Sequence, residues 1–149
     1  MAGAVRLIRK RDGALVASEL RVAEGFVGRA RGLMGRGALQ PGEGLLIRPC
    51  SSIHMMFMRF PIDAVFLRSE QVPGGHALEV VGEVVKVCAR VRPWIGVAWS
   101  LGASCVVELE AGAAERAALR EGDVLCVERA SGFPVAAALM SLDGAEVTS

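Results

Sequence analysis

The alternation of apolar and polar residues is most regular in the middle of the chain, between Met56 and Phe66. Every second residue there is apolar, whereas the intervening positions include Arg59 and Asp63. A period of two with aromatic and branched residues predicts a β-strand. A helix is excluded because Pro61 would interrupt it and no polar face recurs at a spacing of 3.6. We expect the even-numbered side chains to face a core, with Arg59 and Asp63 on the opposite face.

Similar patterns predict strands and turns along the rest of the chain. An Asp-Gly pair at residues 12–13, between two apolar runs, is typical of a β-hairpin. Residues 25–37 place apolar side chains at helical spacing, and residues 111–120 are rich in strong helix formers. We therefore expect two short helices. The further expected strands cover residues 5–9, 14–17, 20–23, 45–47, 78–81, 83–92, 104–109 and 124–128.

These elements predict a mostly β fold, a β-rich α+β domain built as a small barrel or sandwich-like sheet with two short helices. A chain of 149 residues is expected to form one domain and is long enough to bury a core without cross-links. We place that domain at residues 1–129. Residues 130–149 are expected to be a C-terminal tail, docked or frayed.

Charge and hydropathy exclude several classes of protein. The net charge of +1 gives no drive toward nucleic acid, and we expect no nucleic-acid partner. The charge is uneven, since residues 1–68 hold 11 Lys+Arg and 5 Asp+Glu, whereas residues 69–149 hold 6 and 11. We expect the two halves to mix in one fold. The first residues lack a secretory signal pattern and no run is long enough to span a membrane, so we expect a cytoplasmic protein.

The four cysteines form no Cys-x-x-Cys pair, and neither they nor the two histidines show metal-ligand spacing, so no metal or cofactor is expected. Cys88, Cys105 and Cys126 lie in apolar runs and are expected to be reduced thiols in the core. Cys50 lies in a loop near His54. It is the one cysteine that could act as a nucleophile, although no orienting third residue is apparent.

The polar groups of the central segment raise two alternatives. Residues four apart on a strand are about 13 Å apart, so Arg59 and Asp63 cannot pair directly. We favour a structural role in which Asp63 accepts backbone N–H bonds or an arginine and fixes the fold. The functional alternative is a ligand-binding site made of His54, Arg59, Asp63 and Trp94, with the tryptophan flooring a pocket rather than capping the end of a barrel.

No catalytic residues can be assigned, because nucleophile-elbow, phosphate-loop and dinucleotide motifs are missing. We therefore expect a non-catalytic domain that binds a small ligand or a protein partner. The alternative is a small hydrolase-like enzyme using Asp63 and His54, with Cys50 as its nucleophile. A structural accessory of a larger assembly is also compatible with the sequence.

Five segments follow one another along the chain: Arg31-Gly32-Leu33-Met34, the run from Ile53 to Leu67, Pro93-Trp94, Val107–Gly112 and Glu121-Gly122-Asp123. In this order they resemble the DUF192 (UPF0127) family of small bacterial and archaeal domains of uncharacterised function. The resemblance covers residues 14–128 and implies a small domain without an assigned activity. Many members carry Trp-Met-Lys-Asn before a Pro-x-Asp motif. This chain has the Pro-x-Asp, at residues 61–63, but lacks the Trp-Met-Lys-Asn. Residues 69–82 resemble an inserted loop.

Overall fold

Alternating apolar residues form β-strands along most of the chain. The computed structural model describes residues 5–24, 38–56, 58–69 and 78–129. These contain ten strands and one helical turn: β1 Val5–Arg9, β2 Leu15–Ala17, β3 Glu19–Glu24, β4 Glu43–Arg48, β5 Ser52–His54, β6 Ile62–Arg68, β7 Leu78–Val91, β8 Val97–Trp99, β9 Cys105–Glu110, α2 Ala113–Arg116 and β10 Val124–Arg129.

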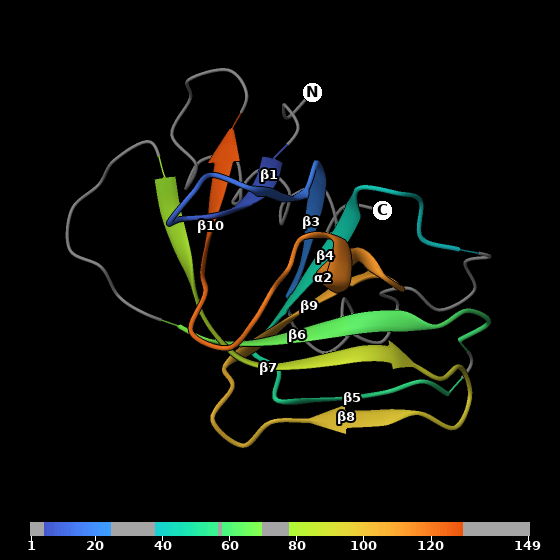
Figure 1. Ribbon diagram of the computed structural model, residues 1–149. Helices are drawn as coiled ribbons and strands as arrows, with labels where there is room; N and C mark the ends of the chain where they lie inside the picture. The colour runs from blue at the N-terminus through green and yellow to red at the C-terminus, as the bar shows by residue number, and fades with distance from the viewer. Residues whose placement is uncertain (1–4, 25–37, 57, 70–77, 130–149) are drawn as a thin grey trace.

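Eight of the strands form one sheet in the order β2-β1-β10-β7-β6-β9-β4-β3. Neighbouring strands are antiparallel except for β3 and β4, which are parallel. The sheet is strongly twisted, and β7 runs through it as a long curved strand (Figure 1). The mostly β fold is therefore confirmed, whereas the sheet is not closed into a barrel, because β2 and β3 end it.

The sheet has an apolar core on each face. We call the core that includes Val65, Val107 and Leu109 the inner core, and the core that includes Ala64 and Phe66 the outer core. Successive residues of β6 point to opposite faces, so both of its faces are buried. The odd-numbered residues of this strand therefore belong to a core as well, which corrects the expectation of a polar opposite face.

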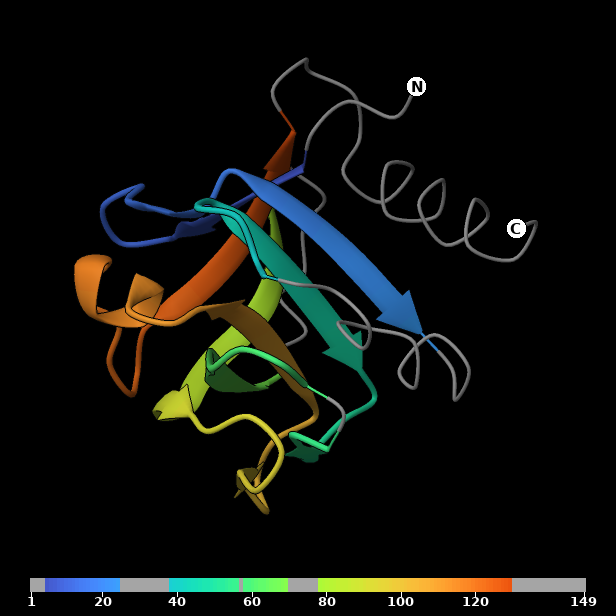
Figure 2. The same ribbon diagram turned by 90° about the vertical axis from the view of Figure 1, so that its right-hand side faces the viewer.

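Strands β5 and β8 form a separate two-stranded antiparallel sheet, called here the ribbon. Ile53 and Ala98 pair across it and belong to the outer core, which they cover. His54 pairs with Val97 on the exposed face of the ribbon. The ribbon lies beside β6 and β7, at the end of the molecule away from the β1–β2 hairpin (Figures 1 and 2).

The central strand is shorter than the sequence predicts. It begins at Ile62 rather than Met56, and Arg59 lies outside any strand. Met56 is 52% exposed, although it heads the predicted buried row, whereas Met58 is buried. Pro61 directly precedes β6. Because proline has no backbone N–H, it cannot donate a hydrogen bond to a neighbouring strand, so the strand begins after it.

Other elements differ in length from their predictions. The expected strands at 78–81 and 83–92 are one strand of 14 residues, β7. The expected helix at 111–120 is one turn of four residues, α2, flanked by Gly112 at φ 95° and Ala118 at φ 52°. The other expected helix and the proposed tail lie outside the described residues. No helix in the described ranges is long and apolar enough to cross a bilayer.

Candidate functional site

Asp63 is fully buried, and its carboxylate accepts three hydrogen bonds from backbone N–H groups. The N–H of Arg90 donates to Oδ1 at 2.8 Å, and those of Gly112 and Ala114 donate to Oδ2 at 3.0 Å each. The carboxylate thus ties β6 to the end of β7 and to the start of α2. Gly112, at the N-cap position of α2, has no side chain that could accept these hydrogen bonds. The Asp63 carboxylate accepts them in its place.

The other three predicted site residues lie at the surface. His54 is exposed on β5, and Arg59 is exposed in the segment between β5 and β6. The Trp94 residue is 54% exposed, and its backbone N–H donates to the backbone carbonyl of Met55 at 2.7 Å. The structure therefore holds the turn of Trp94 beside the end of β5, next to His54. The carboxylate of Asp63 faces the inner core with its cross-strand partner Leu109 and is enclosed.

The hydrogen bonds of the Asp63 carboxylate do not join it to His54, as the hydrolase-like alternative requires. The three partners of Asp63 are backbone amides, and His54 is not among them. The Cys50 thiol contacts the carbonyl of Ser52 at 3.1 Å. Burial raises the pKa of the Cys105 thiol to about 11, which keeps it protonated and unreactive at neutral pH. Among the described residues, no group of three His, Cys, Asp or Glu side chains could hold a metal ion.

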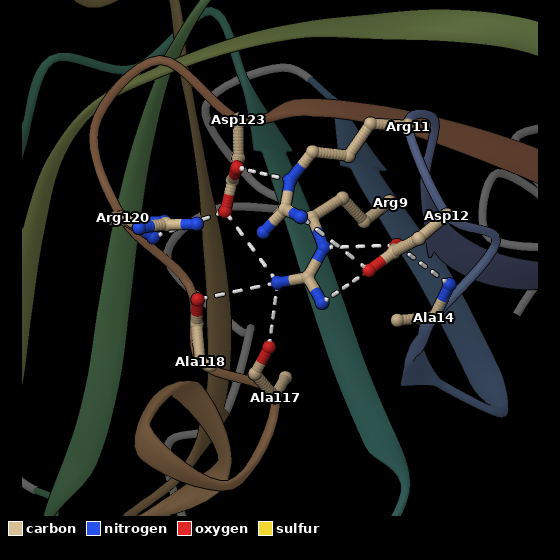
Figure 3. Close-up of polar contacts among 8 residues, drawn as sticks. All are labelled: Arg9, Arg11, Asp12, Ala14, Ala117, Ala118, Arg120 and Asp123. Atoms are coloured by element: carbon tan, nitrogen blue, oxygen red, sulfur yellow. Dashed lines mark hydrogen bonds and ion pairs between the residues drawn. The ribbon is translucent and has the colours of Figure 1, made fainter.

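A second polar cluster joins the β1–β2 turn to the loop before β10 (Figure 3). Arg9 is 6% exposed and donates to the Asp12 carboxylate and to the carbonyls of Ala117 and Ala118. Asp123 lies 3.5 Å from the Arg9 guanidinium and also accepts from Arg11. Hydrogen bonds from Arg9 and from the Ala14 N–H lower the pKa of Asp12 to about 2.

We call this arrangement the Arg9 cluster. Each polar group of Arg9 is already engaged, because Nε and Nη2 donate to Asp12 and Nη1 donates to the two carbonyls. Asp123 is similarly engaged by two arginines and by the N–H of Arg120. A cluster that satisfies its own groups fixes the structure and offers little to a ligand.

A hollow of about 450 Å³ opens between β7, β8 and the turn that connects them. Gly96 permits the tight return of the chain, since a Cβ there would lie 2.4 Å from the carbonyl oxygen of Arg92. The hollow combines apolar walls with two basic side chains. Its lining includes Lys86, Cys88, Val91, Arg92, Val97 and Trp99.

Lys86 has a defined position at this hollow. Its Nζ lies 5.2 Å from the centre of the Trp99 ring and donates to the Trp99 carbonyl at 2.8 Å. A cation over an indole face is a favourable contact. The described part of the chain provides no ion pair for either Lys86 or Arg92, whereas Arg90 pairs with Glu115 at 3.6 Å.

An exposed apolar row runs along β8 and the turns beside it. It consists of Ile95, Val97, Trp99 and Leu101, which are 74%, 59%, 55% and 97% exposed. Val97 and Trp99 alternate with the inward-facing Ala98 and share the exposed face of the ribbon, and Ile95 and Leu101 lie in the turns on either side of β8. We call them the apolar row. The described residues include seven exposed large apolar side chains, and only Leu15 is remote from this end of the molecule.

One buried carboxyl lies on the outer face of the sheet. Glu108 in β9 is 7% exposed and sits between its cross-strand partners Leu45 and Ala64. Burial raises its pKa to about 7. None of the hydrogen bonds or ion pairs between described residues involves this carboxyl. A carboxyl of this kind is a candidate functional group as well as a cost to stability.

Sequence reasoning missed Lys86, Trp99 and Glu108. Trp99 and its neighbours do alternate in the sequence, but a three-residue strand bounded by turns gives too short a pattern to identify. Glu108 interrupts an apolar run, which is the signal that could have marked it. The cation over the indole brings residues 13 apart in the chain together, which only the packing of the ribbon against β7 can reveal.

Comparisons with known proteins agree with this fold. The family model of DUF192, described as "Uncharacterized ACR, COG1430", matches residues 7–127. A protein of unknown function from Novosphingobium aromaticivorans DSM 12444 superposes with a TM-score of 0.64 at 20% identity, over 81% of each chain.

A second solved structure, from Sinorhizobium meliloti 1021 and described as a putative transcription regulator, has a TM-score of 0.63 at 23% identity. The match covers 84% of this chain and 95% of that one. No curated protein matches the sequence. At these identities the two structures show the fold alone, and the family model covers most of the chain. The chain therefore belongs to the DUF192 family.

Proposed function

We propose that this domain is a non-catalytic binding module that contacts a small ligand or a protein partner through the ribbon and the hollow beside it. The observation that carries the proposal is the apolar row. Its four residues, in and beside β8 from Ile95 to Leu101, are each more than half exposed. Contiguous exposed apolar patches, with aromatic residues among them, are typical of interaction sites on domains of this size.

The surroundings of the apolar row support the same conclusion. Residues 48–62 and 84–104, which carry the ribbon and most of the adjoining part of β7, contain five Lys+Arg and no Asp or Glu. His54, Arg59 and Trp94 flank this surface and remain candidate contacts. Asp63 supports it from within, because its carboxylate holds the end of β7 from which the turn of Trp94 begins. Direct contact between Asp63 and a ligand stays a prediction.

The hydrolase-like alternative has less support. A general base needs an orienting group, and the carboxylate expected to orient His54 is occupied by three backbone amides. A location in the cytoplasm is proposed as well, since the four cysteines are free thiols, as in reducing compartments. Cell fractionation followed by immunoblotting tests that location.

Apolar probes test the proposed surface. In 1H–15N NMR spectra of the labelled protein, phenol and cyclohexanol should shift the backbone amides of the ribbon and of residues 86–91. Trp99→Ala should weaken those shifts, because it removes the largest apolar side chain of the hollow. Leu15→Ser is the matched control, since Leu15 is 51% exposed but lies in β2. Shifts that are spread evenly over the surface, or equally sensitive to Leu15→Ser, would contradict the proposal.

A further inference from the structure

The hollow beside β8 is bordered by backbone N–H and C=O groups as well as by apolar side chains. Antiparallel strands direct their backbone groups alternately toward and away from a partner. Across the ribbon, the N–H of Met55 donates to Gly96, and the N–H of Ser100 donates to Ser51. The backbone N–H and C=O groups of even-numbered residues in this segment therefore point toward β5. Those of Val97 and Trp99 point away from it.

The position of Lys86 shows where those groups point. The carbonyl of Trp99 accepts a hydrogen bond from Lys86 Nζ, and both residues line the hollow. The edge of β8 opposite β5 therefore borders the hollow, and the N–H groups of Val97 and Trp99 lie along it. No strand in the described ranges pairs with this edge.

The two basic side chains of the hollow favour a negatively charged ligand. A lysine ammonium has three N–H donors, and the Trp99 carbonyl takes one of them from Lys86. Arg92 also lines the hollow, and neither cation has an ion pair among the described residues. A lysine held in place, a second basic side chain and backbone N–H donors beside apolar walls together favour an anionic group attached to an apolar body.

We propose that this hollow binds a small molecule with an apolar, ring-sized body and one carboxylate or similar anionic group. The body packs against Val97 and Trp99, and the anion takes the remaining donors of Lys86 with help from Arg92. The volume of about 450 Å³ suits a ligand of this size. The inference rests on the proposed binding function and specifies the chemistry of the ligand.

A pair of matched probes tests the choice of anion. 2-Naphthoate carries the carboxylate, and 2-naphthamide has the same body without the charge. In NMR titrations of the labelled protein, 2-naphthoate should bind saturably at amides 86–91 and 96–99. The amide analogue should bind about tenfold more weakly, because its neutral carbonyl can accept a hydrogen bond from Lys86 but forms no ion pair with it. Lys86→Met should weaken naphthoate binding about tenfold and naphthamide binding much less.

Lys10→Met is the matched control for charge, because Lys10 is the only other lysine and lies in the β1–β2 turn. It should leave both probes unaffected. Equal binding of the two probes, or equal loss in both lysine variants, would overturn the choice of anion while leaving the hollow a binding site. Failure of both probes alongside binding to vesicles of phosphatidylglycerol and phosphatidylcholine would also overturn it, because the surface would then serve a membrane.

The failure of this inference and that of the proposed function are distinguishable. The phenol and cyclohexanol shifts test whether the ribbon is a contact surface at all, and they need no charge. If those shifts map to the ribbon but naphthoate shows no preference over naphthamide, only the chemistry assigned to the ligand is wrong. If neutral and charged probes alike avoid the ribbon, both proposals are wrong.

Discussion

The carboxylate of Asp63 accepts a hydrogen bond from the backbone N–H of Ala114, which lies 51 residues later in the chain, at a distance of 3.0 Å. The same oxygen accepts from Gly112, and the other oxygen accepts from Arg90. One buried side chain thereby fixes the relative positions of β6, β7 and α2. The residue that looks most like a ligand anchor in the sequence is also a structural support for the fold.

Asp63→Asn should lower the free energy of unfolding by about 3 kcal/mol, as expected when a buried charged acceptor is lost. An amide that keeps Oδ1 in place would direct its NH₂ at the two N–H donors near α2, which would be left unsatisfied. Urea unfolding followed by circular dichroism measures the change. Glu83→Gln is the control, because the side chains of its ion pair with Arg68 are 58% and 31% exposed and the pair should contribute less than about 1 kcal/mol. A loss no larger than the control's would contradict the structural role.

The Arg9 cluster should also be important for stability. Arg9→Met removes the partner of two carbonyls and of the buried Asp123, and should cost about 3 kcal/mol. Arg6→Met is the control three residues earlier in the same strand, since the Arg6–Glu128 pair is 40% and 36% exposed. Denaturant unfolding compares the two variants through their midpoints, provided that the dependence of the unfolding free energy on denaturant is unchanged. Similar losses of unfolding free energy would show that the Arg9 cluster is no more important for stability than the Arg6–Glu128 pair.

Glu108 should make stability depend on pH near neutrality. Its pKa is about 7 in the folded protein and 4.5 for the free side chain, so between these values the folded state holds a proton that the unfolded state releases. Stability should therefore fall as pH rises from about 4.5 to 7, by up to about 3 kcal/mol in total. Glu108→Gln should remove this dependence and be the more stable protein at pH 8.

The control for Glu108 is Glu110, which lies two residues later in β9 on the same face of the sheet. Glu110 is 18% exposed at its side chain and pairs with Arg116, so Glu110→Gln should preserve the fall in stability. Thermal unfolding at pH 4.5, 6 and 8 compares the variants. Parallel pH profiles for the wild type and Glu108→Gln would show that this carboxyl is not the source.

The apolar row should contribute little to folding. Leu101 is 97% exposed, so Leu101→Ser should change the unfolding free energy by less than about 0.5 kcal/mol. Leu67→Ala, at a fully buried position of β6, should cost about 3 kcal/mol in the same experiment. A large loss for Leu101→Ser would mean that the row is part of the core and not a contact surface.

Local patterns predict much of this fold, and tertiary pairing decides the rest. The Asp12-Gly13 hairpin and the core side of Ile62, Ala64 and Phe66 follow from alternation and turn chemistry. Alternation cannot say whether the intervening residues face solvent or a second core, so the burial of Asp63 and Val65 was not predictable. The preferred structural role of Asp63 agrees with its three amide partners.

The candidate surface was less predictable than the fold. Trp94 was identified from the sequence, but Lys86 and Trp99 gain their meaning only when β7 and β8 come together. A cation in a strand and an indole near a turn are common, and their contact depends on how the ribbon packs beside β7, which no single segment encodes. The ligand-binding roles of His54, Arg59, Asp63 and Trp94 stay predictions.

The most direct test is a crystal structure of the protein soaked with 2-naphthoate. Our account predicts the naphthalene ring against Trp99, with a carboxylate oxygen within about 4 Å of Lys86 Nζ, a distance at which an ion pair forms. A complex in which the naphthoate occupies another part of the surface, or in which this hollow stays empty while the probe binds beside the Arg9 cluster, would contradict it.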